Sequence, residues 1–207
     1  HPWDDFLRQP MLPRRLTESG PGVAFVDWDL DGRDELFFGN GAGGKLVGYK
    51  VAADGRLAKL SEPAFNLPLA GDMLGLGADR QGLLAAVSAH DSAEPAAPSL
   101  LRFRPGEAKP EVIGLPSANH SDAGSIAVVD VDGDGDLDVF VAGRGVPGKF
   151  PQPASSWLLR GGPGGLKLDA GQSAAFANLG MVTAAEFVHL DDDILPELAL
   201  TTEWGPI

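Results

Sequence analysis

The chain has 207 residues, 43% of them hydrophobic, and its 29 acidic and 16 basic residues give a net charge of -13. A chain of this length can bury a hydrophobic core, but its negative charge repels phosphate backbones and anionic lipids, so we expect no nucleic-acid partner. It contains no cysteine, which excludes disulfides, thiolate metal sites and a thiol nucleophile. No apolar run approaches the roughly 18 residues that span a bilayer, so we expect no membrane insertion.

Short apolar stretches bounded by Gly, Pro, Asp or Asn recur along the chain, and helical periodicity is weak. Stretches of this length that are rich in Val, Leu, Ile and Phe are typical of strands, and we predict an all-β protein. The one helix-like alternative is the Ala-rich segment 170–179. In chain order, the expected strands are 23–26, 35–38, 45–49, 83–87, 100–103, 125–129, 138–141, 157–159, 184–188 and 197–200.

An acidic segment is repeated along the chain. Residues 23–36 align with residues 126–139, because in both an apolar strand leads into alternating carboxylates, a Gly and a second apolar strand. Decayed copies occupy 76–85 and 187–198. The first loop positions fall at 27, 77, 130 and 189, with spacings of 50, 53 and 59 residues. Repeats of this length made of short strands indicate the four-stranded blades of a β-propeller, which bury their faces against neighbouring blades.

The repeat divides the chain into a lead-in (1–21), a first blade with an acidic loop (22–70), a degenerate second blade (71–122), a third blade with an acidic loop (123–180) and a partial fourth blade (181–207). Three and a half blades cannot close a ring, because propellers close with roughly four to eight blades. We therefore expect that the rest of a longer propeller, or a partner chain, completes the ring.

The two intact acidic loops, 27–35 and 130–138, have the composition of calcium sites. Each carries carboxylates at loop positions 1, 3, 5 and 9 and Gly at position 6. Converging carboxylate oxygens suit Ca²⁺, which takes 6 to 8 oxygen ligands, and carboxylates this close repel one another without a counter-ion. The predicted ligands are Asp27, Asp29, Asp31, the backbone carbonyl of Arg33 and Glu35 in one loop, and Asp130, Asp132, Asp134, the backbone carbonyl of Asp136 and Asp138 in the other.

An EF-hand shares the first six loop positions, but it requires flanking helices and a bidentate Glu at position 12, where these loops have Phe38 and Val141. We therefore reject it. The copy at 77–85 keeps only Asp79 and Gly82 of the pattern, which predicts a metal-free turn.

The 189–197 loop begins with His189 and has Ile194 in place of the Gly. Histidine is a poor calcium ligand. We expect only a weak third site there, near Asp191, Asp193 and Glu197.

These segments resemble the FG-GAP or VCBS repeats of integrin-type β-propellers, and particularly the bacterial relatives of cartilage acidic protein, the ASPIC/UnbV-associated family. The resemblance is carried by the acidic loops and by residues 11–16 (MLPRRL), 143–151 (GRGVPGKFP), 156–160 (SWLLR), 178–185 (NLGMVTAA) and 203–207 (EWGPI). It implies a larger, seven-bladed ring that is secreted or surface-exposed, stabilised by calcium and used for binding or adhesion. It implies no established general enzymatic activity.

Two further patterns have other interpretations. The G-x-G-x-x-G at 39–44 precedes a strand-like segment, where a dinucleotide site needs a helix. His120, Asp122 and Ser125 have the residue types of a hydrolytic triad, but nothing in the sequence sets their geometry. We therefore predict no catalytic residues and no enzymatic activity.

Together these patterns predict a non-enzymatic, calcium-stabilised binding, adhesion or assembly module that is extracellular, on the cell surface or periplasmic. Its ligand would be a protein or a glycan. One alternative is a carbohydrate-binding or polysaccharide-acting propeller enzyme, because the four Trp residues could form a sugar platform. Another is an accessory subunit of a larger extracytoplasmic complex, which would explain an incomplete propeller.

Overall fold

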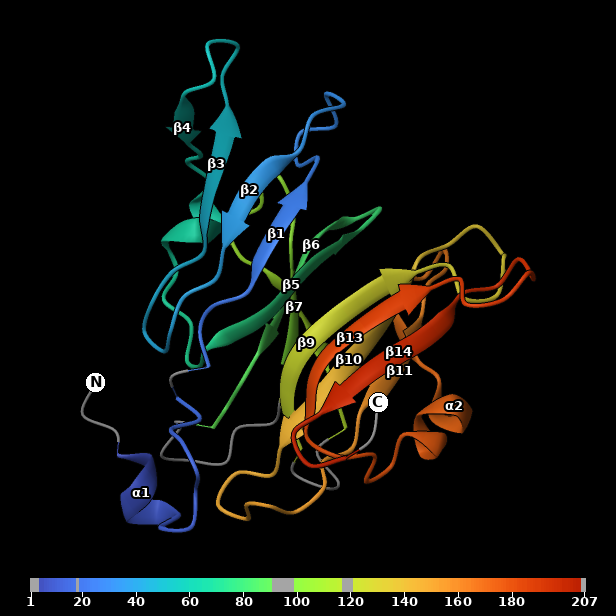
Figure 1. Cartoon of the computed structure of the whole chain (residues 1–207). Coiled ribbons are helices and arrows are strands. Elements are labelled where there is room, and N and C mark those ends of the chain that lie inside the picture. The colour runs from blue at the N-terminus through green and yellow to red at the C-terminus, as the bar shows by residue number, and fades with distance from the viewer. Residues whose placement is uncertain (1–3, 18, 91–98, 117–120, 206–207) are drawn as a thin grey trace.

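Four antiparallel sheets follow one another along the chain (Figure 1). The computed structural model describes residues 4–17, 19–90, 99–116 and 121–205. Three sheets have four strands each, the fourth has two, and the strands within every sheet are ordered as in the sequence. The sheets comprise β1 (Val23–Val26), β2 (Glu35–Phe38), β3 (Val47–Val51) and β4 (Leu57–Lys59); β5 (Met73–Asp79), β6 (Gly82–Val87), β7 (Ser99–Phe103) and β8 (Glu111–Gly114); β9 (Asp122–Val129), β10 (Asp138–Gly145), β11 (Trp157–Arg160) and β12 (Lys167–Leu168); and β13 (Val182–Val188) and β14 (Glu197–Thr202).

The predicted all-β class is confirmed, and the repeated four-stranded sheets are consistent with propeller blades. Four strands were not predicted. β4, β8 and β12 are mostly exposed edge strands with little apolar character, and β5 is interrupted by glycines. The Ala-rich segment does form a helix, α2 (Ala170–Ala175), whose first turn is capped by the carboxylate of Asp169. A one-turn helix, α1 (Asp5–Arg8), and the 3₁₀ helix η1 (Pro63–Asn66) complete the regular structure of the described residues.

The hydrophobic core is divided into three layers, one between each pair of successive sheets. Successive side chains of β10 point to opposite faces of its sheet, so this one strand contributes residues to two layers of the core. Val139 and Val141 pack toward the second sheet, whereas Phe140 and Ala142 pack toward the fourth. The first layer is aromatic, with Trp28 and Phe65 at a ring separation of 5.4 Å.

The first strands of neighbouring sheets, β1, β5, β9 and β13, contact one another in sequence. Gly75 on β5 permits the close approach to β9, because a Cβ there would lie 2.5 Å from the carbonyl oxygen of Gly124. Figure 1 shows β1, β9 and β13 pointing the same way. The acidic loops that follow these three strands therefore leave from the same end of the sheets.

The N-terminal lead-in packs against the opposite ends of the strands. The backbone N–H of Phe150 donates to the side-chain oxygen of Gln9 at 2.7 Å, and Arg14 pairs with Glu203 just after β14. These contacts join the start of the chain to its third and fourth sheets. Across the described ranges, no helix is long and apolar enough to cross a membrane.

Candidate metal centres

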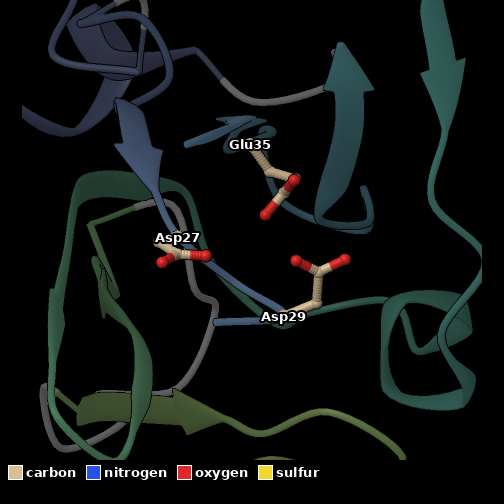
Figure 2. Close-up of side chains that lie close together, drawn as sticks. All are labelled: Asp27, Asp29 and Glu35. Carbon is tan, nitrogen blue, oxygen red and sulfur yellow. The ribbon is translucent and has the colours of Figure 1, made fainter. Parts of the chain in front are cut away.

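Three carboxylates of the 27–35 loop converge on one space (Figure 2). Asp27 directly follows β1, Asp29 lies two residues further on, and Glu35 opens β2. One carboxylate oxygen from each of the three lies within 4.8 Å of the other two. The register of β1 and β2, in which Val26 pairs with Glu35, places both ends of the loop side by side.

Backbone amides hold the turn of this loop. The two carboxylate oxygens of Asp27 accept hydrogen bonds from the backbone N–H groups of Asp31 and Gly32, each at 3.0 Å. Gly32 has a φ of +85°, which explains the Gly at loop position 6, since a side chain is strained in this left-handed conformation. The loop therefore returns toward β2 within a few residues.

Glu35 distinguishes this cluster from an ordinary acidic turn. The residue is 1% exposed, and its Oε2 accepts a hydrogen bond of 2.8 Å from the backbone N–H of Trp28. Its Oε1 is buried and has no hydrogen-bond partner among the described residues, but it forms an ion pair with the ammonium of Lys50 at 3.7 Å. A buried carboxylate oxygen without a hydrogen bond is costly. The residues thus fit a hard cation held by Asp27, Asp29 and Glu35.

The 130–138 loop repeats the arrangement. Asp130, Asp132 and Asp138 each place one carboxylate oxygen within 4.8 Å of the other two. Asp130 accepts backbone hydrogen bonds from Gly135 at 2.8 Å and Gly133 at 2.7 Å. These bonds, that from Gly135 foremost, hold the pKa of Asp130 below its usual range. The carboxylate of Asp130 therefore stays ionised to a lower pH than that of an ordinary Asp.

The buried carboxylate of this second cluster is better satisfied than that of the first. Asp138 is 2% exposed, its Oδ2 accepts from the backbone of Val131 and from Arg160, both at 3.0 Å, and its Oδ1 accepts from Gly161 at 2.8 Å. The Oε1 of Glu35 has no such hydrogen bond. The first cluster is consequently the stronger candidate for a metal.

A third cluster lies in the 189–197 loop, where Asp191, Asp193 and Glu197 gather at loop positions 3, 5 and 9. His189, at position 1, is not part of it. Glu197 accepts a hydrogen bond of 2.7 Å from the backbone of Leu190, as Glu35 does from Trp28. The described residues thus contain three acidic clusters that could hold a metal ion.

The carboxylates predicted at loop position 5 do not join the first two clusters. Asp31 accepts the backbone N–H of Arg33 at 3.0 Å and pairs with Lys50, and Asp134 accepts the backbone N–H of Asp136 at 2.8 Å. Both therefore stabilise turns here. Coordination by these two carboxylates, and by the carbonyls of Arg33 and Asp136, stays a prediction.

The degenerate copy at 77–85 forms a tight hairpin in which Asp79 pairs with Gly82. Asp79 forms an ion pair with Arg102, a residue of β7 that is 1% exposed, and Arg102 also contacts Glu111 at 3.0 Å. A protein cation therefore neutralises the carboxylate of this turn.

The sequence patterns did not predict the role of the basic residues on the third strand of each four-stranded sheet. Lys50 on β3 lies 2.5 Å from Asp29 and 2.6 Å from Asp31. Its hydrogen bonds to these two carboxylates raise the pKa of Lys50 above its usual range, and Lys50 lowers the pKa of Asp31. Arg160, the last residue of β11, lies 3.3 Å from Asp132. In the sequence, the only signal was a basic residue near the end of an apolar strand.

Replacing Lys50 by Met is expected to raise the affinity of the 27–35 loop for a hard cation such as calcium about tenfold, because it removes a positive charge a few ångströms from the candidate ligand oxygens. Calcium titration followed by calorimetry measures the change. Lys59→Met is the matched control, since Lys59 is an exposed residue of β4 on the neighbouring strand. Equal affinities in the Lys50→Met variant and the unaltered protein would show that Lys50 does not compete with the cation.

The remaining residues of interest lie apart from the acidic clusters. Trp28 and Trp157 are buried in the layers between sheets, Trp204 is exposed, and Trp3 lies outside the described residues. Among the three residues with the side chains of a hydrolytic triad, His120 also lies outside the described residues. Asp122 is buried and accepts hydrogen bonds from the hydroxyl of Ser88 and the backbone of Ala89.

Comparison of the sequence with protein-family models and with curated proteins gives no match. The resemblance to FG-GAP or VCBS repeats therefore rests on the loop residues and on the repeated sheets.

Proposed function

We propose that this protein is part of a calcium-stabilised β-propeller of the FG-GAP or VCBS type, and that it acts as a non-enzymatic binding, adhesion or assembly module outside the cytoplasm. Its four-stranded sheets follow one another with their first strands in contact, as blades do around an axis. A larger ring, of about seven blades, belongs to this proposal.

One observation carries the calcium proposal. In the 27–35 loop, one oxygen of Glu35 is buried without a hydrogen bond, and the carboxylate of Glu35 converges with those of Asp27 and Asp29. Carboxylates at the same three loop positions converge in the 130–138 loop, which begins 103 residues further along the chain. All the side-chain ligands are carboxylates, which favours calcium over softer metals.

The residues of each loop have a structural task in this proposal. Glu35 and Asp138 open the second strand of a sheet, while Asp27 and Asp130 follow the first strand. Calcium, when bound, would neutralise the carboxylates. Asp27 and Glu35 would hold the ends of β1 and β2 together, and Asp130 and Asp138 would do the same for β9 and β10. The rigid loops would then display one end of the sheets to a protein or glycan ligand.

Calcium binding by the 207-residue chain, measured by calorimetry after the protein is stripped of metal, tests the proposal. We expect about two ions per chain, because two loops have the full pattern of carboxylates. Glu35→Gln and Asp138→Asn should each remove one of the two. Each substitution keeps the shape of the side chain but removes the negative charge of one candidate ligand.

Asp54→Asn is the matched control, because Asp54 is an exposed carboxylate in the β3–β4 turn, away from the three clusters. It should bind as much calcium as the unaltered protein. The proposal is wrong if the stripped protein binds no calcium at about 5 mM, well above the affinity range of extracellular modules, or if the Glu35 and Asp138 variants bind it unchanged.

A further inference from the structure

The glycine-rich turn between β2 and β3, residues 39–44, contains an Asn–Gly pair. The chain has four Asn residues, at 40, 66, 119 and 178, and Asn40 alone is followed by Gly. Asn40 and Gly41 are both exposed. Asn is one of the thermally labile residues, and a following Gly gives the main chain the freedom to approach the Asn side chain. The turn is therefore a candidate for chemical modification.

The side chain of Asn40 lies against the backbone nitrogen that follows it. Its Oδ1 accepts a hydrogen bond of 3.0 Å from the backbone N–H of Gly41. On another side it packs against Gly44, where a Cβ would lie 2.5 Å from the Cγ of Asn40. This contact explains the last Gly of the G-x-G-x-x-G segment. The side-chain amide is thus held beside the nitrogen of Gly41, and such proximity favours a reaction between the two groups.

The same turn joins the first sheet to the second. The backbone N–H of Met73 donates to the carbonyl oxygen of Asn40 at 3.0 Å, and the backbone N–H of Ala42 donates to Oδ1 of Asp72 at 2.7 Å. Met73 is fully buried in the core layer between these two sheets. A change in the main chain at Asn40 would therefore act on the junction of the first and second sheets.

We propose that Asn40 is a site of spontaneous deamidation, which converts it to aspartate or isoaspartate and weakens the junction between the first and second sheets. The backbone nitrogen of Gly41 bonds to Cγ of Asn40 and loses its proton, while the C–N bond of the side-chain amide breaks and ammonia leaves. Water then opens the cyclic imide at one of its two carbonyl groups. The reaction needs no cofactor and does not depend on calcium.

The two products differ in their effect on the fold. Isoaspartate routes the main chain through the former side chain, so it lengthens the turn by a methylene and displaces the oxygen that accepts the N–H of Met73. Both products add a carboxylate near Asp72, and like charges repel. We expect the unfolding midpoint of the isoaspartate form to lie about 2–4 °C lower, the effect of about one lost hydrogen bond in a chain of this size.

Peptide mapping by mass spectrometry tests the proposal, after the folded 207-residue protein has been incubated at mildly alkaline pH, which assists loss of the N–H proton. The peptide that contains Asn40 should gain the mass difference between an amide and a carboxyl group. Asn66 and Asn178 are internal controls, because both are exposed and followed by Leu, and they should stay unchanged.

Gly41→Ala tests the role of the attacking nitrogen. The substitution should slow deamidation of Asn40 about tenfold or more, because a Cβ restricts the main chain beside that nitrogen. Gly41 is not one of the glycines with positive φ, and a Cβ there would meet Asp72 at an ordinary 3.4 Å, so the variant should fold. Asn40→Asp adds the charge without lengthening the main chain, and its unfolding midpoint should lie between those of the unaltered protein and the isoaspartate form.

Three results would overturn the proposal. The first is an unchanged Asn40 in the folded protein while a synthetic peptide of residues 37–45 deamidates in the same buffer, which would show that the turn protects Asn40. The second is an equal rate in the Gly41→Ala variant and the unaltered protein. The third is an isoaspartate form, isolated by ion exchange, that unfolds at the same temperature as the unmodified protein, which would show that the junction of the sheets is not weakened.

Discussion

Removing calcium is expected to lower the midpoint of thermal unfolding by about 10 °C or more. A ligand at about 100 times its dissociation constant stabilises the folded state by about 2.7 kcal/mol per site. Two such sites contribute about 5 kcal/mol, and each kcal/mol shifts the midpoint of a chain of this size by about 2–4 °C. Circular dichroism melts in calcium at about 100 times the dissociation constant that calorimetry gives, and in excess EDTA, measure the difference.

The physical basis of this shift is the charge of the loops. Without a metal ion, Lys50 and Arg160 compensate the clustered carboxylates only in part, and an oxygen of Glu35 is buried without a hydrogen bond. Glu35→Gln should reduce the calcium-dependent part of the shift by about half, because one of the two sites is lost. If the midpoints in calcium and in EDTA coincide, calcium does not stabilise this fold.

Replacing Arg102 by Met is expected to destabilise the protein by about 3–5 kcal/mol, the usual cost of leaving a buried carboxylate without its partner. Arg102 is 1% exposed and Asp79, its partner in the hairpin, has a side chain that is 6% exposed. Urea unfolding followed by fluorescence measures the loss.

Arg104→Met is the matched control. The side chain of Arg104 is 36% exposed and it pairs with Glu111 near the same hairpin, so its loss should cost less than about 1 kcal/mol. Removing both charges in Arg102→Met with Asp79→Leu should recover part of the stability, because no uncompensated charge is then buried. A cost below 1 kcal/mol for Arg102→Met alone would contradict the interpretation that Arg102 neutralises the buried carboxylate of this turn.

Much of the fold could be predicted from local patterns. The alternation and length of the apolar stretches predicted β1 and β2 at their observed bounds, and the repeated acidic loops predicted the repeated sheets. The strands that were missed, such as β4 and β12, are exposed on the sheet edges. Their pairing is decided by the neighbouring strand, so their own side chains carry little pattern.

The candidate ligands could also be predicted from the sequence, because those of each cluster belong to one short loop. Asp27, Asp29 and Glu35 lie within nine residues, and a tight turn has few ways to arrange them. The position of Asp31 outside this cluster could not be predicted from the sequence. It depends on Lys50, which is 19 residues away in sequence and is brought to the loop by strand pairing.

The sequence by itself therefore determined the class of fold, the repeat and the acidic loops, because strand periodicity and loop composition are local properties of the chain. Only the tertiary structure decided which carboxylate is buried without a hydrogen bond and which basic residue lies against each of the 27–35 and 130–138 loops. Burial, pairing and charge compensation depend on residues far apart in the chain, which meet only when the sheets pack.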